Sequence, residues 1–282
     1  MRNRGFEWDV TFNHTAGDIN YWVKANYTYA RNTIEFQDEV NREFEYQYRT
    51  GQRYGQMFGL IADGFYNTWD EVNDAARPRS SFNGNKIQPG DIKYRDINGD
   101  GIIDVNDEVP IGYPRFPEKI FGFSIGGNYK GFDISVLFQG AANVSVSYSR
   151  HARYGFREDA GVAQYLVDYS WSEDRYEQGL PIDYPRLSEG DQVAAHNYRN
   201  STFWIRDASY LRLKNVEVGY ALNIHLLERL GLNRVRVFAN GNNLLTWSKM
   251  LPGVDPETHV AGTNSEPYPA TRTVNFGLNI QF

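Results

Sequence analysis

The chain has 282 residues, enough for one large domain or two small ones, and its net charge of −6 argues against a nucleic-acid binder. No run of about 18 apolar residues occurs, so the sequence predicts no transmembrane helix. Cysteine is absent, which excludes disulfides and thiolate chemistry. Aromatic residues make up 15% of the chain, a content that suits β-strands and membrane interfaces.

Strict alternation of apolar and polar side chains predicts at least seven β-strands. The first two occupy residues 6–13 and 21–29, and the next two occupy residues 121–129 and 132–139 around a tight turn. A fifth strand ends at Tyr220, a short helix-like stretch covers residues 224–232, and a sixth strand follows at residues 235–240. The last strand covers residues 272–282 and alternates without a slip. Its apolar face carries Val274, Phe276, Leu278, Ile280 and Phe282.

The predicted connections are either short or long. Short ones cover residues 15–18, 130–131 and 222–233, and long ones cover residues 31–119, 141–208 and 246–271. Bacterial outer-membrane barrels have short turns at one end and long loops at the other, whereas a soluble sandwich has no reason to sort its loops in this way. The long connections leave room for further strand pairs, for example at residues 33–48 and 56–66.

Aromatic side chains of the apolar face cluster near the short turns, where the aromatic girdle of a membrane barrel would lie. They are Phe12, Tyr21, Tyr129, Phe132, Tyr220 and Phe282. This clustering favours an all-β, antiparallel transmembrane β-barrel. Seven strands form only part of a wide barrel, so we expect an open sheet whose missing strands lie upstream. Strand-like sequence follows Met1 almost at once, so any signal peptide is also expected upstream.

Several motifs in a fixed order make the chain resemble a known family. Residues 90–112 read GDIKYRDINGDGIIDVNDEVPIG, residues 129–140 read YKGFDISVLFQG, and residues 210–220 read YLRLKNVEVGY. NGNNLLTW follows at residues 240–247, before Asp255-Pro256-Glu257 and the terminal Phe. In order and spacing, the chain resembles the C-terminal part of SusC/RagA-type TonB-dependent outer-membrane transporters of Bacteroidota over residues 5–282.

The resemblance implies that residues 1–282 form the C-terminal segment of a plugged, 22-stranded barrel in the bacterial outer membrane. Residues 31–119, 141–208 and 246–271 would be extracellular loops. The family works with a SusD-like surface lipoprotein and with the TonB complex, and together they import oligosaccharides or peptides across the lipid bilayer. The segments that the family uses to contact TonB are not visible in this sequence.

The sharpest chemical motif is a calcium-loop pattern at residues 96–107. It places side-chain oxygens at positions 1, 3, 5, 9 and 12 of a loop, with the sharp-turn glycine, Gly101, at position 6. The expected calcium ligands are Asp96, Asn98, Asp100, the carbonyl of Ile102, Asp104 and Asp107. An Asx-rich turn whose carboxylates bond only their own backbone is the equally weighted alternative.

Aromatic residues in the long connections are candidates for contacting substrate, because flat rings with a polar tip stack on sugars and on peptide side chains. The candidates are Tyr66, Trp69, Tyr154, Trp171 and Trp204. For any single one of them, packing within the loops is the more usual role. Basic residues on or beside strands are expected to line a barrel lumen or to pair with a plug. They are Arg212, Lys214, Arg234 and Arg236.

Enzymatic activity is not expected. The five histidines are scattered without metal-ligand spacing, and neither a nucleophile elbow nor a phosphate-cradling loop occurs. The alternative to the importer is a soluble, secreted β-sandwich that binds calcium and glycans. The two differ in the fate of the apolar face, which a sandwich buries against a second sheet and a barrel exposes to lipid.

Overall fold

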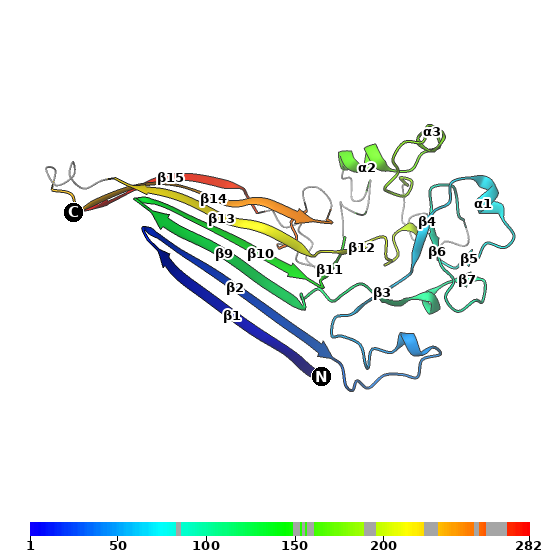
Figure 1. The fold of residues 1–282 in the computed structure, drawn as a ribbon. Helices are drawn as coiled ribbons and strands as arrows, with labels where there is room; N and C mark the ends of the chain where they lie inside the picture. Colours follow the sequence, from blue (N-terminus) through cyan, green and yellow to red (C-terminus); the bar gives the residue numbers. More distant parts are fainter. Residues whose placement is uncertain are drawn as a thin grey trace.

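The computed structural model describes residues 1–82, 86–148, 153, 156, 161–188, 196–222, 231–250, 254–257 and 270–282. Its main element is an antiparallel seven-stranded sheet in the order β1-β2-β9-β10-β13-β14-β15. The strands are β1 (Arg2–Ala16), β2 (Ile19–Thr33), β9 (Lys119–Tyr129), β10 (Phe132–Ala142), β13 (Tyr210–Ala221), β14 (Arg234–Ser248) and β15 (Thr273–Gln281). The sheet is open, with β1 and β15 at its two edges (Figure 1).

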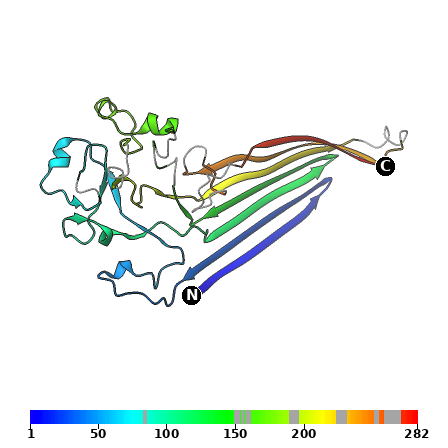
Figure 2. The ribbon, with the colours of Figure 1, turned by 180° about the vertical axis from the view of Figure 1, so that it is seen from behind.

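The connections sort to opposite ends of the sheet. Residues 17–18 join β1 to β2 and residues 130–131 join β9 to β10, and both turns lie at one end (Figure 1). Residues 34–118 join β2 to β9, residues 143–209 join β10 to β13, and both segments gather at the other end, as Figure 2 shows from behind. Loop asymmetry inferred from the residue pattern is therefore a property of the structure.

One face of the sheet is apolar and uncovered. Phe12, Val23, Ile125, Val136 and Val216 are successive partners across the first five strands. On β15, Phe276 is 83% exposed and Val274 is 57% exposed. Among the described residues, no second sheet packs on this face, which makes the soluble β-sandwich interpretation wrong.

Two rows of side chains rich in aromatics border the apolar face. Near the short turns, Tyr129, Phe132 and Tyr220 are direct partners, and the rings of Phe132 and Tyr220 lie 4.4 Å apart. A second row lies near the long connections and crosses six strands through Trp8, Tyr27, Phe121, Gly140, Leu211 and Trp247. From Phe121 to Tyr129 the strand advances about 26 Å, which at a tilt of about 40° gives a band roughly 20 Å tall, somewhat less than the apolar band of about 25 Å of a transmembrane barrel.

A glycine is required in the second row. The ring of Phe121 lies over Gly140, and a Cβ atom there would come within 2.4 Å of that ring. The aromatic row thus continues across β10, because Gly140 has no side chain and the ring of Phe121 covers it.

The opposite face of the sheet is polar and bonded from strand to strand. Asn20 Nδ2 donates to Asn128 Oδ1 at 3.0 Å, and Asn215 Nδ2 donates to Asn242 Oδ1 at 3.0 Å. Asn275 continues this pattern with a 2.9 Å bond to Asn240 on β14. In a barrel, a face of this kind lines the lumen.

The two long connections form a unit with its own core. It contains the two-stranded sheets β3 (Met57–Gly59) with β8 (Val109–Ile111), β4 (Ala62–Phe65) with β6 (Ile92–Tyr94), β5 (Arg79–Ser80) with β7 (Ile102–Ile103), and β11 (Ser145–Ser147) with β12 (Ile205–Asp207). Its helices are η1 (Glu45–Gln47), α1 (Trp69–Asn73), η2 (Val105–Asp107), α2 (Gln164–Tyr169) and α3 (Glu173–Glu177). Of the helices that the structure describes, none is long and apolar enough to cross a membrane. The buried cluster comprises Leu60, Ile92, Tyr94, Ile103, Val144, Val146, Tyr148, Leu166, Tyr184, Trp204, Ala208 and Met250.

Two expectations for the connections need correction. Residues 34–48 contain only the short helix η1 and no strand pair, because side-chain bonds hold the segment instead: Glu39 accepts from the backbone amides of Arg49 and Thr50. Residues 57–65 form β3 and β4, but each pairs within the connections rather than with the main sheet. Most of the helix-like stretch, residues 223–230, lies outside the described residues.

Candidate functional site

His196 and Asn197 fasten the second long connection to the first. The imidazole Nε2 of His196 lies 2.7 Å from the Ile92 carbonyl oxygen, and its Nδ1 lies 2.8 Å from Ser80 Oγ. Burial lowers the pKa of His196, and this effect outweighs the hydrogen bond to the Ile92 backbone, which would raise the pKa. The ring is therefore neutral near pH 7 and accepts at Nδ1 while it donates from Nε2. Asn197 adds an Nδ2 donation to Asp91 Oδ1 at 2.8 Å.

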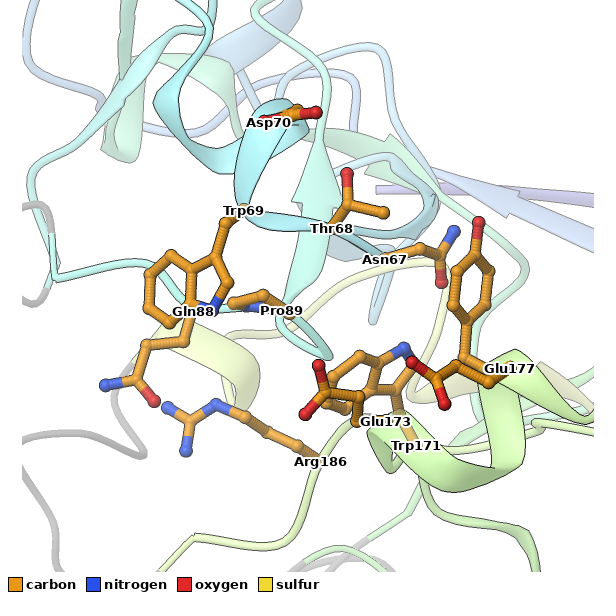
Figure 3. A pocket seen from close by; sticks show the side chains of 11 residues that line it. Asn67, Thr68, Trp69, Asp70, Gln88, Pro89, Trp171, Glu173, Glu177 and Arg186 are labelled. Carbon is orange, nitrogen blue, oxygen red and sulfur yellow. The ribbon is translucent and has the colours of Figure 1, made fainter.

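A pocket of about 460 Å³ opens where the two long connections meet (Figure 3). Its volume lies within the usual range of small-molecule sites, about 300–1,000 Å³. The first connection contributes Asn67, Thr68, Trp69, Asp70, Gln88 and Pro89, and the second contributes Trp171, Glu173, Tyr176, Glu177 and Arg186. Both connections must therefore be in place for the pocket to exist.

Local structure positions each wall of this pocket. Thr68 caps α1 by accepting from the Glu71 amide, which places Trp69 and Asp70 in the first turn. Ser172 caps α3 in the same way through the Arg175 amide, so that Glu173 begins the helix. Each cap satisfies a backbone donor that a helix start leaves unpaired.

A glycine lies directly behind two of the pocket residues, Trp171 and Arg186. Gly90 has φ +88°, and a Cβ atom there would lie 2.5 Å from the Trp171 ring and 2.7 Å from Arg186 Cβ. The Gly90 amide donates to the Tyr66 carbonyl at 2.6 Å, and its carbonyl accepts from the Arg186 amide at 2.9 Å. Only a residue without a side chain allows Trp171 and Arg186 to approach this backbone so closely.

The candidate aromatics separate into two groups. Trp69 is 56% exposed and lines the pocket, and Trp171 lines it as well. Tyr66 is 7% exposed in a small cluster with Val72 and Ile87, and Trp204 is 1% exposed and donates from Nε1 to the Asn197 carbonyl at 2.6 Å. Both side chains therefore pack inside the loop unit, and their contact with substrate stays a prediction. Tyr154 lies outside the described residues.

The predicted calcium loop is ordered by its own carboxylates. Asp96 accepts from the amides of Gly99 and Gly101, each at 2.7 Å, and Asp100 accepts from the Ile102 amide at 2.7 Å. Fully buried Asp107 accepts from the amides of Ile97 and Asp104 at 2.7 and 2.9 Å. Burial raises the pKa of Asp107 and outweighs these hydrogen bonds, which would lower the pKa.

The chemistry of the loop suits a hard cation, because a carboxylate oxygen that accepts one amide keeps a second lone pair. Asn98 and Asp104 accept in the same way from the neighbouring amides of Asp100 and Asn106. Across the described residues, no three His, Cys, Asp or Glu side chains lie close enough together to hold a metal ion. Calcium binding at residues 96–107 stays a prediction.

An ion cluster ties the start of β13 to the connection between β14 and β15. Arg212, 2% exposed, donates to Asp255 and to Glu257 at 2.7 Å each, and Lys214 reaches Glu257 at 2.7 Å. Burial alone would raise the pKa of Asp255, but the bonds from Arg212 and from two backbone amides outweigh it and lower the pKa. Arg212 and Lys214 thus pair with residues of this same chain.

Two further charged groups stabilise the sheet and its junction with the loops. Arg236 on β14 pairs with Asp133 and Glu217 across the polar face. Glu118, just before β9, accepts from Arg31 at 2.9 Å, from Arg53 at 2.6 Å and from Asn143 at 3.0 Å. Burial alone would raise the pKa of Glu118, but these bonds lower it, so the carboxylate stays charged where both long connections begin.

The fold and the site together define a class of protein. An open antiparallel sheet with an exposed apolar face, bordered by aromatic rows and carrying a packed loop unit at one end, is a portion of a transmembrane β-barrel.

Comparison with known proteins places the chain within this class. It is 33% identical over 204 residues to TonB-dependent receptor P26 of Formosa agariphila, which covers 68% of the chain and 20% of that receptor. It is 26% identical over 291 residues to the TonB-dependent receptor SusC of Bacteroides thetaiotaomicron, covering 99% of the chain and 25% of SusC. No family model matches the chain.

Solved structures show the same fold. The chain superposes on the RagAB peptide transporter with a TM-score of 0.68 at 22% identity, covering 99% of this chain and 29% of that one. These matches confirm the resemblance to SusC/RagA-type TonB-dependent receptors and the partial barrel fold. The chain spans only a fifth to a third of the length of the curated relatives that it matches.

Proposed function

We propose that this chain is part of an outer-membrane, TonB-dependent importer that takes up oligosaccharides or peptides with a SusD-like surface lipoprotein. Its role is non-enzymatic. The strands form barrel wall, the polar face lines the lumen, and residues 31–119, 141–208 and 246–271 form extracellular loops that help to enclose the substrate. Coupling to TonB runs through other segments of the receptor.

The observation that carries this proposal is that the sheet has one apolar face and one polar face, and that rows of aromatic side chains border the apolar face at both ends. Lipid is the solvent that suits an uncovered apolar face about 20 Å tall between two aromatic rows. Unpaired strand edges at β1 and β15 call for further strands, since backbone groups in a bilayer must be bonded. The pocketed loop unit lies at the long-connection end, which in bacterial barrels faces outside.

The experiment is deletion of the complete gene from the source bacterium. The strain should lose growth on at least one oligosaccharide or peptide mixture as sole nutrient, and a plasmid copy should restore it. An epitope-tagged receptor should fractionate with the outer membrane and co-purify with a surface lipoprotein. Growth unchanged on every nutrient tested, or a tagged protein in the soluble fraction, would refute the proposal.

A further inference from the structure

The pocket between the two long connections is unbalanced in charge. Asp70, Glu173 and Glu177 bring carboxylates to its lining, and Arg186 is the cation among the described lining residues. Arg186 is already paired, because its Nε donates at 2.7 Å to Asp91, whose side chain is fully buried. The three lining carboxylates are therefore uncompensated from within the described pocket.

Helix α3 concentrates this negative charge on one side. Glu173 and Glu177 are four residues apart, so both project from the same face of the helix, and Tyr176 lies beside them. Like charges at this spacing weaken a helix. An arrangement that costs helix stability is understandable where a ligand supplies the opposite charge.

Aromatic faces lie next to the carboxylates. In Figure 3 the side chains of Glu173 and Glu177 flank the indole of Trp171, while Trp69 reaches toward the pocket from α1. The face of an indole attracts ammonium and guanidinium groups, and Trp is the strongest of the aromatic residues in this respect. Indole and carboxylates thus select the same kind of ligand group.

We propose that this pocket binds the cationic side chain of a peptide, lysine or arginine. Glu173 and Glu177 pair with the cation, and the apolar stem of the side chain lies against the indole of Trp171. This inference rests on the proposed function and deepens it: the importer takes basic peptides in preference to neutral oligosaccharides.

The test is isothermal titration calorimetry on the receptor expressed from its complete gene and purified in detergent. The probes are acetyl-Ala-Lys-Ala-amide, its norleucine analogue of the same shape without charge, maltotriose, and the glucosamine trimer, a cationic sugar. The lysine peptide should bind about tenfold more tightly than the norleucine peptide, a difference of about 1.4 kcal/mol. Its affinity should fall with added salt.

Variants connect the preference to the pocket. Glu173→Gln with Glu177→Gln should weaken lysine-peptide binding about tenfold and leave norleucine-peptide binding unchanged. Asp174→Asn is the matched control, because it removes the same charge from α3 at a position that does not line the pocket, and it should change neither affinity.

Equal affinities for the lysine and norleucine peptides would overturn the proposal, as would an unchanged lysine-peptide affinity in the double variant. Tighter binding of the glucosamine trimer or of maltotriose would overturn the assignment to peptides. If gene deletion abolishes growth while lysine preference is absent, only the pocket assignment fails. If deletion has no effect on growth, the importer itself fails, whatever the calorimetry shows.

Discussion

Replacing Arg212 with Met should release the connection between β14 and β15 from the start of β13. The guanidinium holds Asp255 and Glu257 at 2.7 Å each and Thr246 at 2.9 Å, and it is 2% exposed. Met keeps most of the side-chain volume but removes the charge and all donors. Two carboxylates then remain without the cation that they surround.

The expected cost is about 3 kcal/mol, the lower end of the range for removing one partner of a buried ion pair. The lower end applies because both carboxylates keep other donors. Asp255 still accepts from the amides of Glu257 and Ala270 at 2.9 Å each, and Glu257 keeps Lys214 at 2.7 Å. A cost of 3 kcal/mol corresponds to an opening equilibrium about 100-fold larger.

Hydrogen exchange on the purified receptor measures this opening directly. The amides of Glu257 and Ala270, which both donate to Asp255, should exchange about 100-fold faster in the Arg212→Met variant. Arg234→Met, the same change at the exposed start of β14, is the control and should leave both rates unchanged. Unchanged exchange in the Arg212 variant would refute the assignment of the cluster as the clamp of this connection.

Three further predictions follow from the sheet and the loop unit. Ile125→Arg, midway between the two aromatic rows on the apolar face, should cost about 2–4 kcal/mol and lower the yield of folded receptor in heat-modifiability gels, while Ser124→Arg on the polar face should be tolerated. Calcium titrated into the receptor should give a binding isotherm that Asp96→Asn with Asp100→Asn abolishes; a flat isotherm for the unaltered receptor would leave residues 96–107 as an Asx-rich turn. The pKa of His196 in the folded protein lies below the ordinary value of 6.5. As the pH falls, His196 is therefore protonated more readily in the unfolded loops than in the folded ones, which favours unfolding. The loop unit should keep its full stability above about pH 6.5 and lose stability below that pH. Tryptophan-fluorescence melting at pH 7.5 and pH 5 should show this loss, and a His196→Asn variant with the same loss would contradict the mechanism.

Strands of the main sheet could be predicted because their signal is local. One face of each strand is apolar and the other is polar, so apolar and polar residues alternate along the sequence with a period of two. Val274, Phe276 and Leu278 are an example, since all three are more than half exposed on the apolar face. The Lys130-Gly131 turn could be predicted as well, because it is a short glycine-containing break between two alternating runs, and both residues adopt the positive φ of a tight hairpin.

The pocket could not be predicted in the same way, because its walls come from distant parts of the chain. Trp69 and Trp171 meet only when residues 34–118 and 143–209 pack together, and no periodicity links them. Residue type does not reveal burial either: Trp204 and Trp69 are the same amino acid, yet one is 1% exposed and the other 56%. Glu173 and Glu177 show no pattern in the sequence that sets them apart from other surface carboxylates, and they become candidates only because they line the pocket.

The main buried core of this chain lies in the loop unit and not in the sheet. The sheet and the loop unit are consequently stabilised in different media. Hydrocarbon suits the apolar face of the sheet, whereas the loop unit is stabilised by the exclusion of water from side chains such as Leu60 and Ile92. Mutations that alter the loop surface leave the strand pairing untouched, so selection can reshape what the loops recognise without rebuilding the wall that carries them. A single barrel scaffold can in this way carry many different loops while its strands change slowly.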